Sequence, residues 1–311
     1  MITRYIIKRL VLLIPLLLGI TLVSFTLLRA LPGDIALSLA GEHASQETIE
    51  SIRKEIGVDK GALNQYAGYL KMLIRGDFGR SYYTNRDVLT DIALKFPNTL
   101  KLAFAAMALA IPLGIIIGYA AAYKSGGLVE KIIDGLSLAG LSIPVFWSAI
   151  IIMIIFSLGL KLLPPSGTGN IRFLILPACT LAIPAAATLV RVTRTAVTDV
   201  LGMPFITTAI AKGLPLRKIH IHHVLKNAII PIVTIIGLDF GSYLNGAVVT
   251  ETIFGWDGIG RFTMEGIIKR DYPVIMGCII AGTVVFVIVN LLIDVLYHYL
   301  DPRIRLHGKE S

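Results

Sequence analysis

Six long apolar segments constrain the fold of this 311-residue chain more than any other feature. An α-helix rises 1.5 Å per residue, so the hydrocarbon core of a bilayer, roughly 30 Å thick, needs about 20 apolar residues. The segments that meet this length are 10–31, 99–123, 134–160, 171–193, 227–250 and 274–297. Helices satisfy their own backbone hydrogen bonds in lipid. The sequence therefore predicts an all-α integral membrane protein with six transmembrane helices.

The overall composition supports a membrane protein and argues against a nucleic-acid-binding protein. The chain is 55% hydrophobic and 16% charged, and a soluble domain of this size could not bury so much apolar surface. Its formal net charge is +9, but Lys and Arg gather in short loops beside apolar segments, as membrane orientation requires. The first apolar segment is too long for the h-region of a signal peptide, so we interpret it as a retained helix.

The distribution of Lys and Arg predicts the orientation of the chain in the membrane. With the N-terminus in the cytoplasm, 14 of these residues lie in the tails and short loops inside, against five in the short loops outside. Cytoplasmic loops carry the excess of positive charge in membrane proteins. We therefore expect a multi-pass protein of the cell (inner, cytoplasmic) membrane with both termini in the cytoplasm.

The predicted helices divide the chain into four parts. Residues 1–31 form the N-terminal cytoplasmic end and the first transmembrane helix, and residues 32–98 form an external loop region with helices at 46–56 and 64–75. Ser45 is the expected N-cap of the first of these helices. Residues 99–300 form a five-helix transmembrane core with a cytoplasmic loop at 194–226, and residues 301–311 form a cytoplasmic tail.

Motifs of common enzyme sites are absent from the sequence. It contains no G-x-x-x-x-G-K-[ST], H-E-x-x-H or G-x-S-x-G pattern, so we predict no catalytic residue, no bound cofactor and no nucleotide site in this chain. His220, His222 and His223 lie among Lys and Arg, which favours a solvated surface over a metal site. Cys179 and Cys278 lack the spacing of metal ligands, and we predict no metal site.

The cytoplasmic loop after the fourth apolar segment has the pattern of a helical hairpin. A helix-compatible segment at 205–212 is followed by Gly213, and Pro215 suits the first turn of a second helix. Leu216 and Ile219 would share one side of that second helix. The pattern predicts an amphipathic hairpin outside the bilayer that docks onto another protein. The alternative is a helix that rests on lipid headgroups.

This loop resembles the coupling segment, or EAA loop, of the permeases of binding-protein-dependent ABC importers. The family pattern is E-A-A, three residues and then Gly, and the matching residues here are Thr207-Thr208-Ala209 and Gly213. The Glu and the first Ala of the pattern are absent, so a polar contact by that Glu is not carried over. The run Leu225-Lys226-Asn227-Ala228 with Pro231 is similar to the peptide and nickel branch of the family.

Eight further motifs extend the resemblance along nearly the whole chain. In order, they are Leu31-Pro32-Gly33-Asp34, Gly76-Asp77-Phe78-Gly79-Arg80-Ser81, Pro97-Asn98-Thr99-Leu100, Ser142-Ile143-Pro144 with Trp147, Glu251-Thr252-Ile253-Phe254-Gly255-Trp256, Gly258-Ile259-Gly260, Arg270-Asp271-Tyr272-Pro273 and Asp301-Pro302-Arg303. Each motif alone is weak, but their order on a six-span pattern makes the resemblance specific.

The resemblance implies the permease subunit of an ATP-driven ABC importer. Such a subunit forms a heterodimer with a second, similar permease, and two cytoplasmic ATPases bind the ATP and Mg. An extracytoplasmic binding protein delivers the substrate. The family implies di- or oligopeptides as cargo, with nickel or a metal chelate as the alternative. The resemblance assigns docking of the ATPase to the hairpin, and we expect it at Thr207, Thr208, Ala209, Gly213, Leu216 and Ile219.

A secondary transporter that works alone is the alternative from another class. Such a protein would normally contain inverted repeats and ion-coupling carboxylates near the middle of the membrane. No repeat is evident in the sequence, and Asp239 is the only such carboxylate near the middle of a predicted span.

Polar residues in the fifth apolar segment indicate a translocation path. Asp239, Ser242, Gly246 and Thr250 would fall within about 80° of one helix face, with Asn245 at its margin. An Asp inside a span costs at least ~2.5 kcal/mol on insertion scales, so it should face water or a partner. We predict that this stripe lines the path. The alternative is a polar seam between packed helices.

Two further sites are predicted near the path. Ser142, Pro144 and Trp147 interrupt the third apolar segment and are the predicted gate, because Pro bends a helix. The external loop at 254–270 is rich in Gly and aromatic residues and would form an outer gate or contact the binding protein. Its expected residues are Phe254, Trp256, Gly258 and Gly260, and Trp256 has the simpler alternative of an interfacial anchor.

Overall fold

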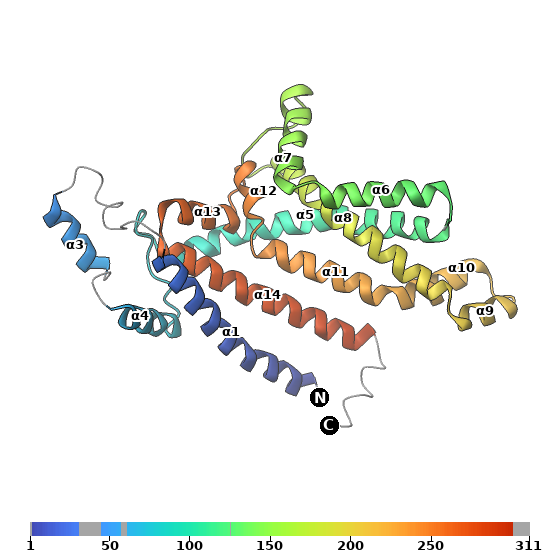
Figure 1. Ribbon diagram of the computed structural model, residues 1–311, viewed down its shortest axis with the longest axis horizontal. Coiled ribbons are helices and arrows are strands. Elements are labelled where there is room, and N and C mark those ends of the chain that lie inside the picture. The colour runs from blue at the N-terminus through green and yellow to red at the C-terminus, as the bar shows by residue number, and fades with distance from the viewer. Residues whose placement is uncertain (1, 31–44, 57–60, 125, 301–311) are drawn as a thin grey trace.

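The computed structural model describes residues 2–30, 45–56, 61–124 and 126–300 of the chain. Every element in these ranges is a helix, which confirms the predicted all-α class. Five of the described helices are long and apolar enough to cross a membrane, or six spans if one bent pair counts as a single span. Figure 1 shows the long helices side by side, with the described N-terminal end and the end of α14 on the same side of the molecule.

Four of the predicted spans are single long helices. They are α1 (Ile2–Ala30), α5 (Val88–Tyr123), α8 (Ile171–Leu201) and α14 (Tyr272–Leu300). The fifth segment is α11 (Lys226–Leu244), which is continuous with α10 (Leu216–Lys218) and the π-helical η2 (Ile219–Leu225). This span therefore starts earlier and ends earlier than the predicted 227–250.

The third predicted span, 134–160, is not one straight helix. It is divided into α6 (Leu128–Ser142) and the pair formed by α7 (Val145–Met153) and the π-helical η1 (Ile154–Gly159), which meet at an angle of 98°. Ile143 has an extended backbone because helical angles are disfavoured before Pro144. Pro144 lacks an N–H and starts the next helix. In Figure 1, α7 points away from the bundle of long helices.

The bundle is held together most closely where α5 and α8 cross. Gly118 of α5 faces α8 so closely that an added Cβ would lie 2.5 Å from the Val190 carbonyl oxygen, and Gly114 makes a similar approach to Leu189. Small residues allow membrane helices to pack with their backbones close together. The largest buried cluster extends from this crossing to Ile206, Val224 and other residues of the segment after α8.

Two short helices precede α5, as predicted for the external loop region. They are α3 (Gln46–Ile56) and α4 (Ala62–Ile74). The Ser45 hydroxyl accepts a hydrogen bond from the Thr48 N–H at 3.2 Å, which confirms the predicted N-cap. The Tyr66 hydroxyl of α4 lies 3.0 Å from the Thr21 hydroxyl and attaches α4 to α1.

The chain turns back after α11 through a segment that we call the return loop, residues 245–271. It contains α12 (Val248–Ile253) and α13 (Ile259–Lys269). Gly246 starts the reversal with φ of +100°, and an added Cβ there would lie 2.7 Å from the Gly260 Cα. Only glycine combines this backbone conformation with so close an approach.

Candidate functional site

The predicted cytoplasmic hairpin is present as a short helix, α9 (Pro204–Ala211), between α8 and α10. We call residues 202–219 the α9 hairpin. Pro204 occupies the first turn of α9, where its missing N–H costs no hydrogen bond. Gly213 has φ of +74°, and its N–H donates to the Ile210 carbonyl at 2.9 Å. The structure thus confirms the predicted turn at Gly213.

The second helix of the predicted hairpin is α10, which is the first turn of a longer helix and not a helix of its own. The chain passes from α10 through η2 into α11 without a break, and α8 ends only a few residues before α9. A force on α9 is therefore applied directly to the ends of two long helices. Rigid helices transmit such a displacement as rigid-body motion.

Burial separates the predicted docking residues of the α9 hairpin into two groups. Thr207, Thr208, Gly213 and Leu216 are exposed, and Leu216 has 59% of its surface accessible. In contrast, Ala209 and Ile219 are buried, the latter with 1% exposed, and they pack in the core cluster with Ile206. Ala209 and Ile219 were expected among the docking residues, but their side chains pack inside this chain and are not offered to another protein. Their apolar surface stabilises the hairpin instead.

The histidines near the α9 hairpin differ from the sequence interpretation. His220 is half-buried, its Nδ1 forms a hydrogen bond with the Tyr119 hydroxyl, and its ring meets the Tyr123 ring edge-on. The expected solvated surface is therefore wrong for His220, because the end of α5 packs against η2. Within the residues that the structure describes, no group of three or more His, Cys, Asp or Glu is placed to hold a metal ion.

A charged contact that sequence reasoning missed connects α8 to α6. The Arg194 guanidinium lies 2.9 Å from Asp134 Oδ2 and also forms an ion pair with Glu130. The Glu130 carboxylate accepts a further hydrogen bond from the Gly126 N–H. The spacing of Glu130 and Asp134, one helical turn apart, is the signal that a search for charged partners could have used.

The return loop is anchored to the start of α5 by the Glu251 carboxylate. This side chain is fully buried, and it accepts hydrogen bonds from the Thr99 hydroxyl at 2.9 Å and the Arg261 N–H at 3.0 Å. The Thr99 oxygen in turn accepts from the Ile259 N–H at 2.9 Å. Glu251 and Thr99 together thus cap the N-terminus of α13, where N–H groups lack partners within the helix. Burial raises the pKa of Glu251, although these hydrogen bonds oppose the shift.

Close contacts around this anchor explain two of the predicted loop glycines. A Cβ on Gly258 would lie 2.5 Å from the Thr99 hydroxyl and would also overlap the Glu251 carboxylate. A Cβ on Gly260 would lie 2.8 Å from the Val248 nitrogen. Both positions therefore require the absence of a side chain, which the motif alone did not explain.

Trp256 is not an interfacial anchor. It is 3% exposed and packs against Leu102 and Leu181, and its indole N–H donates to the Asn98 carbonyl at 2.9 Å. An interfacial Trp would place its N–H near water, whereas here a backbone carbonyl satisfies it. Phe254 is likewise buried and packs with Ala149 of α7.

The N-terminal third of α5 makes further contacts with the return loop. The Asn98 side chain donates to the Asp257 carbonyl at 2.8 Å, and the Lys95 ammonium forms an ion pair with the Asp257 carboxylate. On the other side of the loop, the buried Asp271 accepts hydrogen bonds from the Ser81 hydroxyl and from the Tyr82 N–H. Five of the motifs that carried the resemblance therefore make contacts in two groups: 97–100 contacts 251–256 and 258–260, and 76–81 contacts 270–273.

The predicted polar stripe does not lie on one continuous helix face. Asp239 and Ser242 lie on α11, but that helix ends at Leu244 and Thr250 belongs to α12. The reason is the left-handed conformation at Gly246, which breaks the helix. The assumption of an unbroken helix was therefore wrong for Gly246 and Thr250. Asp239 keeps a buried carboxylate oxygen, Oδ2, with no hydrogen-bond partner in the described part of the chain.

The predicted gate residues mark the bend between α6 and α7. The Ser142 hydroxyl donates to the Leu138 carbonyl at 2.8 Å, and Pro144 caps α7. Trp147 lies on α7 with about half of its surface exposed. These residues lie together at the 98° bend. The apolar segment therefore bends at the point where they interrupt it.

Comparison with known proteins identifies the family. Residues 110–306 match the family described as binding-protein-dependent transport system inner membrane component, and residues 1–103 match the N-terminal part of such components. The dipeptide transport system permease protein DppB of Escherichia coli K12 is 36% identical, over 97% of this chain and 98% of that protein. DppB of Alkalihalophilus pseudofirmus is also 36% identical, over 97% and 99% of the two chains.

Two further comparisons agree with this result. The glutathione transport system permease protein GsiC of Pectobacterium atrosepticum is 39% identical, over 97% of this chain and 99% of that protein. An inward-facing structure of the MetNI methionine ABC transporter covers 68% of this chain and 97% of its own with a TM-score of 0.58; at 14% identity it supports the fold alone. The chain therefore belongs to the family of binding-protein-dependent transport system inner membrane components, the permeases of ABC transporters.

Proposed function

We propose that this chain is the transmembrane permease subunit of an ATP-driven importer that carries di- or oligopeptides. The observation that carries this proposal is the near full-length similarity to dipeptide permeases at 36% identity. The relatives described above are named as dipeptide and glutathione transport permeases. These names do not favour the alternative cargo, nickel or a metal chelate.

The energy for transport comes from partner subunits. The chain lacks the phosphate-binding motif G-x-x-x-x-G-K-[ST], so ATP and Mg are bound by two ATPase subunits in the cytoplasm. A second permease of similar fold completes the channel, and an extracytoplasmic binding protein delivers the peptide. The chain itself is a non-catalytic membrane subunit.

The ATPase docks on the exposed side of the α9 hairpin. The exposed residues Thr207, Thr208 and Leu216 provide this surface, while Ile206, Ala209 and Ile219 hold the helix against the bundle. Because α9 lies between α8 and α10, and α10 continues through η2 into α11, displacement of α9 moves the two long helices α8 and α11. Arg194 then transfers the motion of α8 to α6 through its ion pairs.

The peptide passes along the side of α11 that carries Asp239 and Ser242. The unpartnered Oδ2 atom of Asp239 supports this assignment, because a buried carboxylate oxygen without a partner is costly unless it meets water or a ligand. The bend at Ser142, Pro144 and Trp147 acts as the gate. The return loop with Phe254, Trp256, Gly258 and Gly260 closes the external end and is held by Glu251.

Reconstitution in vesicles tests the proposed function. The chain is reconstituted with its second permease, with and without the two ATPases, and uptake of a labelled dipeptide is measured in the presence of the binding protein. Uptake should require both the ATPases and ATP. Uptake that continues without them would favour the secondary transporter, and uptake of a nickel chelate in place of the peptide would favour the other cargo.

A further inference from the structure

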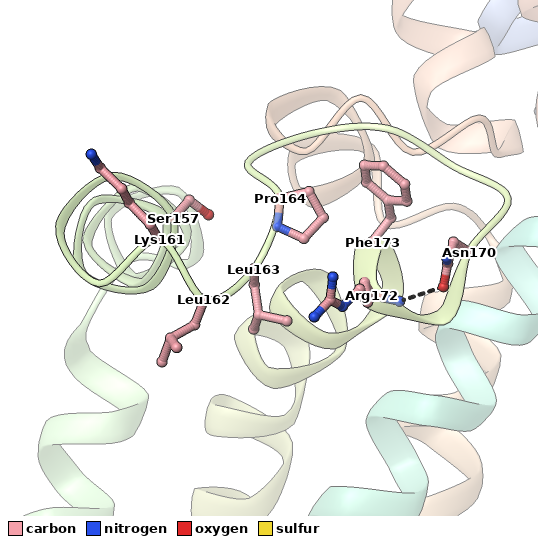
Figure 2. Close-up of a pocket in the computed structure, with 8 residues that line it drawn as sticks. All are labelled: Ser157, Lys161, Leu162, Leu163, Pro164, Asn170, Arg172 and Phe173. Atoms are coloured by element: carbon pink, nitrogen blue, oxygen red, sulfur yellow. Dashed lines mark hydrogen bonds between the residues drawn. The ribbon is translucent and has the colours of Figure 1, made fainter.

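A cavity of about 430 Å³ lies between the end of η1 and the start of α8, at the opposite end of α8 from the α9 hairpin (Figure 2). Its apolar walls are formed by Leu163, Pro164 and Phe173, and its polar residues include Ser157 and Arg172. None of the residues that line it is acidic. The cavity has the size of a ligand site and a positive local charge.

The Ser157 hydroxyl is the first sign of a ligand. Ser157 is 8% exposed, and its oxygen is buried with no hydrogen-bond partner in the described part of the chain. Serine hydroxyls in helices usually donate to a carbonyl of the preceding turn, as Ser148 does to the Pro144 carbonyl at 3.2 Å. In Figure 2, the Ser157 hydroxyl is directed from η1 toward the cavity. A buried polar group of this kind normally has a partner.

The Arg172 guanidinium supplies the charge. Figure 2 shows it directed toward Leu163, on the η1 side of the cavity, whereas the Lys161 side chain points away from Arg172. The Arg172 backbone N–H is already bonded to the Asn170 side chain at 3.2 Å. Arg172 also lies in the first turn of α8, a helix of 31 residues whose N-terminus carries a partial positive charge. These donors together favour an anion that accepts several hydrogen bonds.

The surroundings of the cavity indicate that the anion is attached to an apolar group. Leu158, Leu160 and Ile171 beside the cavity are all more than half exposed. These side chains flank η1, at the end of an apolar segment long enough to enter a bilayer, where lipid surrounds an exposed aliphatic side chain. A small soluble anion would make no use of the apolar walls, whereas a phospholipid matches both the walls and the donors.

We propose that this cavity binds the phosphate group of a membrane phospholipid, with Arg172 and Ser157 as its donors. The acyl chains then lie along the exposed sides of η1 and α8. The bound lipid connects the arm formed by α7 and η1 to the bundle from which it bends away. This site does not depend on the cargo of the transporter.

Native mass spectrometry tests the proposal on the full-length chain, co-purified with its partner subunits in detergent. Phosphatidylglycerol is added, and its retention is compared among the unchanged chain, Arg172→Gln, Ser157→Ala and the control Arg75→Gln, which removes an exposed arginine elsewhere. We expect about tenfold weaker retention for Arg172→Gln and a smaller loss for Ser157→Ala. The control should retain lipid as the unchanged chain does. Equal retention by all four proteins would overturn the proposal.

Two further measurements identify the source of the anion and exclude misfolding. Ser157→Ala removes an unpartnered hydroxyl, so the lipid-free protein should unfold at the same or a higher temperature while its stabilisation by lipid decreases. Glycerol phosphate and inorganic phosphate should bind far more weakly than the lipid. If either binds as tightly, the site is one for a free anion, and if neutral diacylglycerol is retained as strongly as phosphatidylglycerol, the phosphate is not recognised. Each of these results contradicts the proposal.

Discussion

At the scale of single residues, the buried carboxylate of Glu251 has the clearest role. It joins the start of α5 to the return loop through Thr99 and the N-terminus of α13. The carboxylate also explains why Gly258 carries no side chain, whereas the Val248 backbone lies nearest to an added Cβ on Gly260. One acidic residue thus accounts for two positions, Thr99 and Gly258, that the sequence marked only as parts of motifs.

Replacement of this carboxylate should weaken the anchor of the return loop. Glu251→Ala leaves the Thr99 hydroxyl and the Arg261 N–H without their buried acceptor, which costs about 1–3 kcal/mol each in such cases. We expect a lower unfolding temperature of the purified complex and a smaller decrease for Glu251→Gln, which keeps one acceptor.

The raised pKa of Glu251 predicts that the stability of the protein depends on pH. Because the pKa of Glu251 is raised in the folded protein, its contribution to stability is complete below the ordinary pKa and is lost as the pH rises through the raised value. Glu251→Gln should remove this part of the pH dependence of the unfolding temperature. An identical pH profile in the two proteins would contradict the assignment.

The close approach of Thr99 and Glu251 to Gly258 predicts that a side chain at this position lowers stability. Gly258→Ala forces a Cβ against Thr99 and Glu251, and overpacking of this kind typically costs about 1–3 kcal/mol. Gly68→Ala is the matched control, since nothing lies within 4 Å of its added Cβ. Thermal unfolding should separate the two variants, and equal stabilities would show that the loop yields without cost.

Asp239 provides the residue-scale test of the translocation path. Asp239→Asn keeps the size of the side chain but removes its charge, so uptake of a labelled dipeptide should fall while the amount of protein in the membrane stays constant. Ser51→Ala, an exposed residue of α3, serves as a control. Unchanged transport would assign Asp239 to helix packing.

At the scale of elements, α9 combines a buried side and an exposed side within eight residues. Hydrophobic burial holds Ile206, Ala209 and Ile219 in the bundle, and the opposite side is free to bind. Helix periodicity predicted that such sides exist. Helix periodicity could not show that Ile219 lies on the buried side, because its burial depends on how η2 packs against α9.

This division predicts opposite outcomes for two substitutions of the same kind. Leu216→Asp changes an exposed residue, so the protein should insert normally but lose association with the ATPases, measured by co-purification. Ile219→Asp places a charge in the core, so the amount of folded protein itself should fall. Normal association of Leu216→Asp would refute docking at this surface.

At the scale of the whole molecule, six apolar segments become five long helices and one bent pair in the described part of the chain. The bend at Pro144 directs α7 out of the bundle (Figure 1). The positive charge in the loops predicts that the α9 hairpin and the N-terminus share the cytoplasmic side, and the arrangement of the helices is compatible with that orientation.

Labelling from one side of the membrane tests this orientation. In a variant without Cys179 and Cys278, Thr207→Cys should react with a membrane-impermeant thiol reagent only in inverted vesicles. Ser166→Cys, in the loop before α8, should react only from the opposite side. Reaction of Thr207→Cys from the external side would place α9 beyond the reach of a cytoplasmic ATPase.

The sequence alone determined the all-α class, the number of apolar segments, the turn at Gly213 and the family resemblance. These depend on local properties: the length of an apolar run, the backbone freedom of glycine and the order of short motifs along the chain. The tertiary structure decided the roles of Trp256, Ile219 and Glu251. Whether such a side chain faces lipid, a partner or the core depends on which distant segment packs against it, and no local pattern contains that information.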